Sequence, residues 1–218
     1  MKLYMNPVST TSRPVSLFAA EAGIPLDEIV IDLMTGEHKA PDFVAVNPNG
    51  LVPVLDDDGF VLTESSAILK YLAEKANSPL YPDDLQERAR VNEAMDWLNA
   101  NFYRDFGFNY VYPQIMPHHR RRTDTGNADV VTWGYEKSCE WLSVLDRHFI
   151  GPKSDYICLG RLTIADFMGA GIVSLGEVIG FDFSQYPHIM RWLAAMKRLE
   201  HWDRVNEAFH RMVAAEAA

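Results

Sequence analysis

Hydroxyl side chains follow the first short apolar segment and stand directly before a helical pattern. They are the four residues of PVSTTSR numbered Ser9, Thr10, Thr11 and Ser12. Backbone N–H groups at a helix start have no partner within the helix, so this junction favours an anion. A thiol held there would ionise more easily, yet the segment contains no cysteine, so the thiol would have to belong to a ligand. The structural alternative is that Ser12 caps the helix and the other hydroxyls fill a polar turn.

A proline inside an expected strand marks a second candidate site. Proline has no N–H to donate to a strand ladder, so Pro53 between Val52 and Val54 is unusual for a strand over residues 51–55. If the Val52–Pro53 bond is cis, the N–H and C=O of Val52 turn outward and can pair with an extended peptide. The sequence therefore predicts a peptide-like ligand beside Val52.

Glu64 and Ser65 stand where the next strand passes into a helix. The helix start and the Ser65 hydroxyl favour a carboxylate, and the Glu64 carboxylate favours an ammonium group. Together they would bind the zwitterionic end of an amino acid. The same two residues also suit a helix-capping pair, and the spacing alone does not separate the two interpretations.

The elements that position these residues alternate between strand and helix. Period-two and helical patterns predict strands at residues 2–5, 28–33, 51–55 and 60–64, and helices at 12–22 and from 65 onward. Residues 77–84, NSPLYPDD, have the composition of a linker. Beyond them the apolar residues recur at helical spacing, and Thr163 with Asp166 forms a capping box before an apolar helix. We expect an α/β domain over 1–76 and an all-helical domain over 85–218.

Composition narrows the class of protein. Twenty basic against thirty acidic residues give a formal charge of −10, which disfavours binding to nucleic acid or an anionic membrane. The start of the chain lacks a secretory apolar core, and two cysteines do not make a disulfide framework, so we expect a soluble cytoplasmic protein. The adjacent His118 and His119 lack further ligands, so no metal is expected. The basic run 120–122 is interpreted as a solvated loop that could attract an anionic substrate.

Four segments together resemble the cytosolic glutathione transferases, most closely the theta-like and related bacterial members. They are KLYMNPVSTTSRPV, GEHKAPDFVAVNPNGLVPVL, LTESSAILKYL and LTIADF, and the resemblance covers essentially the whole chain. It implies a thioredoxin-like N-terminal domain followed by a helix-bundle domain. It also implies that Ser9 stabilises the thiolate of bound glutathione, with Ser12 as the main alternative.

The resemblance assigns the rest of the tripeptide as well. Val52, before Pro53, would pair with the cysteinyl backbone, and Glu64 with Ser65 would hold the γ-glutamyl end. His38, with Lys39 beside it, would approach the glycyl carboxylate. The edge of the helix over residues 101–113 would line the pocket for the electrophile, with Phe106 and Tyr110 as candidates.

The implied activity is detoxifying transfer of glutathione, as co-substrate, to a small hydrophobic electrophile by a homodimer without a metal. A glutathione-dependent dehalogenase would use the same first site and differ in what the second pocket accepts. A non-catalytic glutathione-binding carrier is the alternative of a different class. It predicts glutathione binding without a lowered thiol pKa.

Overall fold

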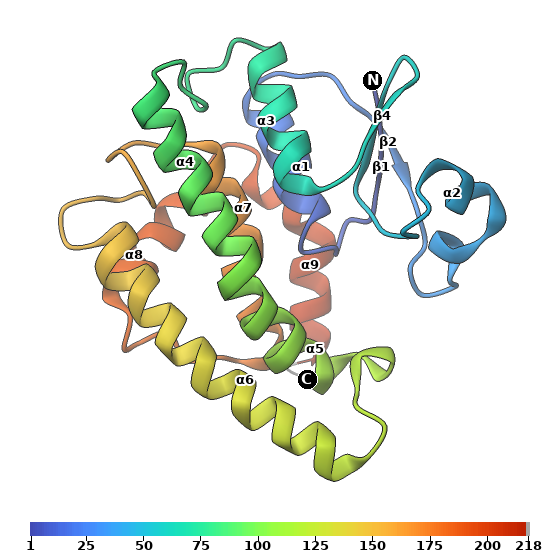
Figure 1. The fold of residues 1–218 in the computed structure, drawn as a ribbon, viewed down its shortest axis with the longest axis vertical. Helices are drawn as coiled ribbons and strands as arrows, with labels where there is room; N and C mark the ends of the chain where they lie inside the picture. Colours follow the sequence, from blue (N-terminus) through green and yellow to red (C-terminus); the bar gives the residue numbers. More distant parts are fainter. Residues whose placement is uncertain (217–218) are drawn as a thin grey trace.

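The computed structural model describes residues 1–216, which form an α/β domain and a larger helical domain (Figure 1). The α/β domain contains a four-stranded sheet with the strand order β2-β1-β3-β4. β1 and β2 run parallel, whereas β3 is antiparallel to both β1 and β4. Its elements are β1 (Lys2–Met5), α1 (Ser12–Glu21), β2 (Asp27–Val30), α2 (Pro41–Val46), β3 (Val54–Asp57), β4 (Phe60–Leu62) and α3 (Ser65–Lys75). The expected thioredoxin-like arrangement is confirmed.

The strand that follows the proline starts later than the sequence pattern predicts. β3 begins at Val54, so Pro53 precedes the ladder and removes no ladder hydrogen bond. The Val52–Pro53 peptide bond is cis. The expectation of a strand over 51–55 with a proline inside it was therefore wrong at its N-terminal end.

The rest of the described chain is helical, as the sequence predicts. A single long axis runs through α4 and a π-helical continuation, and a second runs through α6 and a shorter π-helical segment. The bounds are α4 (Leu85–Trp97), π segment Leu98–Val111, α5 (Tyr112–Ile115), α6 (Asp124–Val144), π segment Leu145–Ile150, α7 (Ile164–Ser174), α8 (Pro187–Met196) and α9 (Trp202–Glu216). Among residues 1–216, none of these helices combines the length and apolar character that a bilayer crossing requires.

Helix α7 lies in the middle of the helical domain (Figure 1), and every one of its residues is buried. Its start is the capping box expected from the sequence: Thr163 accepts the N3 backbone N–H, and Asp166 accepts the Thr163 backbone N–H at 2.7 Å. The Asp166 carboxylate also accepts the Trp192 indole N–H at 3.0 Å and the Ile157 backbone N–H at 2.8 Å. One carboxylate therefore ties α7 to α8 and to the preceding loop.

The segment between α3 and α4 packs against the helical domain. The Ile164 N–H donates to the Leu80 carbonyl at 3.0 Å, and the Arg88 guanidinium donates to the Pro82 carbonyl at 2.7 Å. Tyr81 is buried. These contacts fix the connection between the two domains, in contrast to a flexible tether.

The two domains share one hydrophobic core, and α1 packs on α7 at their junction. The backbones approach closely there because residue 171 is glycine: a Cβ on Gly171 would lie 2.7 Å from the Thr10 carbonyl oxygen and 2.5 Å from Pro14 Cγ. Arg13 is buried beside this contact and donates to Asn206 Oδ1 at 2.6 Å. The junction thus holds the loop that carries the hydroxyl residues.

Candidate active site

The sheet brings together, at one end, the segments that carry the residues predicted for glutathione binding. Residues 6–12 follow β1 and residues 31–39 follow β2, and these two strands are parallel. Leu55 of β3 pairs with Leu62 of β4, so continuing that antiparallel register places Glu64 opposite Pro53 and Ser65 opposite Val52. Segments far apart in the sequence therefore meet where β1 and β2 end and β3 begins.

Ser9 caps the helix that follows it. Its Oγ accepts the backbone N–H groups of Thr11 at 3.3 Å and Ser12 at 3.2 Å, which are the first unpartnered donors of α1. The helix begins at Ser12, and no side-chain cap comes from its N-cap residue, Thr11. The structural alternative in which Ser12 caps the helix was therefore wrong, because Ser9 occupies that role.

Ser9 and Ser12 differ sharply in exposure. Ser12 has 0% exposed surface, and its Oγ accepts a long 3.4 Å hydrogen bond from the Asn6 N–H. Ser9 is partly exposed. A ligand approaching from outside could reach the Ser9 hydroxyl but would have to displace packed atoms to reach Ser12.

A hydroxyl relay joins Ser9 to Val52. Thr11 Oγ1 donates to the Val52 carbonyl at 3.1 Å, and it lies 3.2 Å from Ser9 Oγ. Because the Thr11 proton is directed at Val52, the Ser9 hydroxyl is the donor in the second contact. Hydrogen bonds therefore run from Ser9 to Thr11 and from Thr11 to Val52, and they connect two of the predicted site residues. The Ser9 proton is donated to the Thr11 hydroxyl oxygen, and a stronger acceptor could take the place of that oxygen.

The backbone of Glu64 adopts an uncommon conformation immediately before α3. Its φ of 67° and ψ of 114° lie in a region that non-glycine residues rarely occupy. Ser65 is the first residue of α3, so its N–H is among those with no partner inside the helix. Glu64 is exposed and Ser65 is buried to 9% exposure, which places the carboxylate outward and the helix start behind it.

His38 and Lys39 lie in a 3₁₀ turn, Glu37–Lys39, after β2. Lys39 Nζ donates to the Gly50 carbonyl at 2.9 Å, which ties this turn to the segment before Val52. His38 Nδ1 is buried and has no hydrogen-bond partner among the described residues. Burial, then the charge of Lys39 and that of His118, lower the pKa of His38, so its ring favours the neutral form.

The two residues proposed from the sequence for the electrophile pocket face the helical core. Phe106 has 0% exposed surface and packs on Phe102 with ring centroids 5.0 Å apart. Tyr110 is half-buried and lies against Tyr135 and Phe181 on the same side. Phe106 therefore cannot contact a ligand without rearrangement of the core, whereas Tyr110 keeps some surface.

The opposite face of the same long helix contacts the segment between β1 and α1, residues 6–11, which we call the Ser9 loop. Sequence reasoning missed this contact. Tyr112 donates to Thr10 Oγ1 at 2.9 Å, and Tyr103 lies 2.6 Å from the Tyr112 hydroxyl. Phe108, 44% exposed, lies 5.3 Å from the Tyr112 ring between centroids. The i,i+4 spacing of 108 and 112 was a visible signal, but it matches that of 106 and 110, so spacing alone could not say which face meets the α/β domain.

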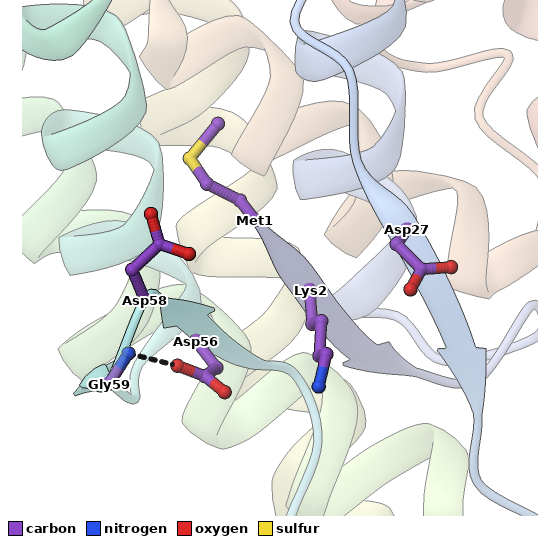
Figure 2. A pocket seen from close by; sticks show the side chains of 6 residues that line it. All are labelled: Met1, Lys2, Asp27, Asp56, Asp58 and Gly59. Carbon is purple, nitrogen blue, oxygen red and sulfur yellow. Dashed lines mark hydrogen bonds between the residues drawn. The ribbon is translucent and has the colours of Figure 1, made fainter.

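Two cavities in the surface lie elsewhere. One of about 420 Å³ opens at the other end of the sheet, where Met1 precedes β1, Lys2 begins it, Asp56 lies in β3 and Asp58 lies in the β3–β4 turn (Figure 2). Another of about 370 Å³ lies beside α8 and is lined by residues such as Phe183. Neither contains a sequence-predicted site residue. Among residues 1–216, no cluster of three or more His, Cys, Asp or Glu side chains could hold a metal ion.

Comparison with known proteins identifies the family. Residues 8–75 match the family model described as glutathione S-transferase, N-terminal domain, and residues 103–200 match glutathione S-transferase, C-terminal domain. Human glutathione S-transferase theta-2 is 32% identical over 195 residues, covering 88% of this chain and 78% of that relative.

Solved structures agree. Human glutathione transferase theta-2, in a complex with glutathione and an unknown ligand, has a TM-score of 0.88 at 30% identity and covers 99% of this chain and 90% of its own. A delta-class glutathione transferase from Nilaparvata lugens has a TM-score of 0.84 at 32% identity, with 99% of both chains covered. The chain belongs to the glutathione S-transferase family and is an enzyme of that class.

Proposed function

We propose that this enzyme binds reduced glutathione at the end of the sheet and activates its thiol through Ser9. The single observation that carries the proposal is the geometry of the Ser9 hydroxyl. Its oxygen is held by two backbone N–H groups of α1, while its proton is donated to Thr11 Oγ1. A thiolate is a stronger acceptor than a neutral hydroxyl, so a sulfur placed beside Ser9 would take that proton donation.

The energy required is available from these groups. Lowering a thiol pKa from about 8.5 to about 6.5 requires roughly 2.7 kcal/mol of preferential stabilisation of the thiolate. One hydrogen bond to a charged acceptor contributes about 1.5–3 kcal/mol, and a helix N-terminus contributes up to about 2 kcal/mol. Ser9 and the start of α1 are therefore sufficient.

The other proposed contacts hold the remaining parts of the glutathione tripeptide. The Val52 backbone would pair with the cysteinyl residue, and its carbonyl can accept a second hydrogen bond while it retains that of Thr11. Glu64 and the start of α3 at Ser65 would hold the ammonium and carboxylate of the γ-glutamyl end. His38, whose buried Nδ1 lacks a partner within the described chain, would meet the glycyl carboxylate beside Lys39.

The second substrate would lie against the helical domain. Phe108 offers exposed aromatic surface and packs directly on the Tyr112 ring, and the Tyr112 hydroxyl donates a hydrogen bond to Thr10 of the Ser9 loop. Tyr110 stays a candidate at the edge of this region. The glutathione sulfur would form a bond to an electrophilic carbon, and a leaving group such as halide would depart with the bonding electron pair. We further propose, as the resemblance implies, a homodimer that acts in the cytoplasm.

Steady-state conjugation of chlorodinitrobenzene tests the proposal. We expect wild-type enzyme to release chloride with saturation in glutathione, and Ser9→Ala to lower kcat/KM by about 10²-fold while retaining glutathione binding. Thr63→Ala changes a residue outside the proposed glutathione contacts and is the control for general effects of substitution on activity. Binding of glutathione without any turnover above the uncatalysed rate would favour the carrier alternative and contradict the proposal.

A further inference from the structure

The segment that joins α5 to α6 carries a concentration of basic side chains. We call residues 116–122 the basic loop; its cation-forming members are His118, His119, Arg120, Arg121 and Arg122. Basic residues are therefore unevenly distributed in this chain, whose formal net charge is −10. On sequence alone the loop is a solvated one, but the structure gives it specific neighbours.

His119 of the basic loop packs on the aromatic residues that reach the Ser9 loop. The ring of His119 packs against Tyr112, with centroids 4.9 Å apart, and against Phe108 at 5.5 Å. The Tyr112 hydroxyl donates to Thr10, the neighbour of Ser9. The Tyr112 side chain therefore lies between His119 and the Ser9 loop.

His118, the neighbour of His119, is close enough to His38 of the α/β domain to affect its pKa. The charge of His118 contributes to lowering the pKa of His38, after the larger effects of burial and Lys39. In Figure 1 the chain after α5 turns toward the side where α2 and the end of β2 lie. The basic loop thus extends from the thiol side of the proposed glutathione site toward its glycyl side.

The positive charge of Arg121 has no carboxylate partner among the described residues, and the neighbouring His119 ring is a hydrogen-bond donor. Burial lowers the pKa of His119, and the neighbouring His118 and Arg121 add to this effect, so the His119 ring favours the neutral form and offers an N–H donor. The Arg121 guanidinium donates to the neutral amide oxygen of Asn109 at 3.2 Å, which leaves its charge uncompensated. A site with surplus positive charge and an adjacent aromatic surface favours an aromatic or unsaturated anion.

The nearby carboxylates have cationic partners of their own. Asp124 accepts from Arg120 at 3.1 Å, and Asp105 accepts from Arg104 at 3.0 Å. Asp105 also accepts from Asn109 at 2.9 Å, so the Asn109 amide separates it from Arg121. These pairings leave Arg121 and Arg122 without a carboxylate partner among the described residues. Arg121 is the one held by a hydrogen bond to Asn109, next to Phe108 in the long helix.

We propose that the electrophile carries an acidic group, a carboxylate or sulfonate, that binds between His119 and Arg121 while its reacting carbon faces Ser9. The body of the substrate lies on Phe108, whose exposed surface is 44%. This inference rests on the proposed function and specifies the substrate class of the same site. It assigns different roles to adjacent residues of the basic loop: His118 influences His38 on the glycyl side, and His119 with Arg121 selects the second substrate.

A matched pair of substrates tests the inference. Chloronitrobenzoate, with chloride para to the carboxylate and ortho to the nitro group, is compared with the corresponding chloronitrobenzamide. In both, the thiolate sulfur bonds to the ring carbon and chloride leaves with the electron pair. Each kcat/KM is divided by the uncatalysed rate constant, because the two rings differ in intrinsic reactivity. We expect a normalised preference for the acid of about tenfold or more, since a hydrogen bond to a charged group contributes at least that factor.

Three variants locate the effect. His119→Phe keeps a ring against Tyr112 and removes the N–H donor, so it lowers the acid-to-amide ratio several-fold, because a charged acceptor gains more from that bond than a neutral one. Arg121→Gln removes the charge at an exposed position and lowers the ratio about tenfold. Arg120→Gln, in the same loop but paired with Asp124, leaves the ratio unchanged. A ratio that stays the same in both His119→Phe and Arg121→Gln overturns the inference while the transferase function stands. Absence of turnover for amide, acid and chlorodinitrobenzene alike removes the proposed function and the inference with it.

Discussion

Tyr112 of the helical domain donates a 2.9 Å hydrogen bond to Thr10 of the loop that carries Ser9. Both residues are buried, and Tyr103 completes the chain at 2.6 Å from the Tyr112 hydroxyl. Because Tyr112 donates to Thr10, Tyr103 must donate to Tyr112. The position of the Ser9 loop is therefore set by both domains, and changes on the helical side should reach it.

The first prediction concerns that hydrogen bond. Tyr112→Phe keeps the ring but leaves the Thr10 and Tyr103 hydroxyls without this partner, so the free energy of unfolding should fall by about 1–2 kcal/mol. We expect kcat/KM for chlorodinitrobenzene to fall several-fold because the loop loses a restraint. Urea unfolding and steady-state kinetics measure the two effects. A stability equal to that of wild type would show that the bond makes no net contribution.

Gly171 provides a second test of the domain junction. A methyl group at this position would lie 2.5 Å from Pro14 Cγ and 2.7 Å from the Thr10 carbonyl, so Gly171→Ala must displace the Ser9 loop or α7. We expect a loss of stability of about 1–3 kcal/mol together with reduced activity.

Gly169 on the same helix is the matched control. A Cβ there would meet Ile157 Cδ1 at 2.5 Å, the end of a flexible side chain remote from Ser9. Gly169→Ala should therefore reduce stability with little change in kcat/KM measured well below the melting temperature. Equal losses of activity in the two variants would contradict a specific role for the contact at Gly171.

Arg13 provides a third prediction, because it is a buried cation to which no carboxylate of residues 1–216 is hydrogen-bonded. Its guanidinium lies 3.7 Å from the centre of the Phe209 ring and donates to Asn206, and burial lowers the pKa of Arg13 to about 10. Arg13→Met leaves Asn206 and Ser174 without their donor, so we expect a loss of roughly 3 kcal/mol in chemical denaturation. Arg90→Met, at an exposed ion pair with Glu93, should change little. A neutral or stabilising effect of Arg13→Met would show that apolar packing compensates for the lost bonds.

The fourth prediction concerns pH. Burial raises the pKa of Asp166 to about 6, although the backbone N–H groups of Ile157 and Thr163 act in the opposite direction. The native state therefore retains the Asp166 proton at pH values where the unfolded chain has lost it. This contribution to stability is fully present below the unfolded pKa of about 4 and is lost as pH rises through about 6, amounting to about 3 kcal/mol.

Comparison with Asp166→Asn isolates this effect, because contributions from other groups cancel in the difference between the two proteins. The free energy of unfolding of wild type minus that of the variant should be larger at acid pH than at neutral pH. Urea titrations from about pH 4 to about pH 8 measure it. A difference that grows with pH would mean that the donors around Asp166 hold the ionised form.

Local patterns were sufficient for most of the fold. KLYM alternates between faces and forms β1 over Lys2–Met5, and the Thr163–Asp166 spacing identified the start of α7 because both groups act within one helical turn. The start of β3 was misplaced, since the apolar residues around Pro53 resemble a strand whether or not they pair. The π-helical segment Leu98–Val111 had no signal in the sequence, because its apolar spacing also fits an α-helix.

The sequence could predict the candidate site residues that stand directly before or after a strand. It could not predict the residues whose position depends on how the two domains pack. Ser9, Val52 and Glu64 each precede or follow a strand, so the sheet brings them together. Which aromatic residues face Ser9 depends on the rotation of the long helix against the α/β domain, and contacts such as Tyr112 with Thr10 fix that rotation.

The most direct test of the central claim is the thiolate absorbance of enzyme-bound glutathione as a function of pH, in wild type, Ser9→Ala and Ser12→Ala. We predict a bound thiol pKa well below that of free glutathione in wild type, a return toward the free value in Ser9→Ala, and a retained shift in Ser12→Ala. A shift that disappears in Ser12→Ala but persists in Ser9→Ala, or bound glutathione with no shift in the wild-type enzyme, would contradict the account.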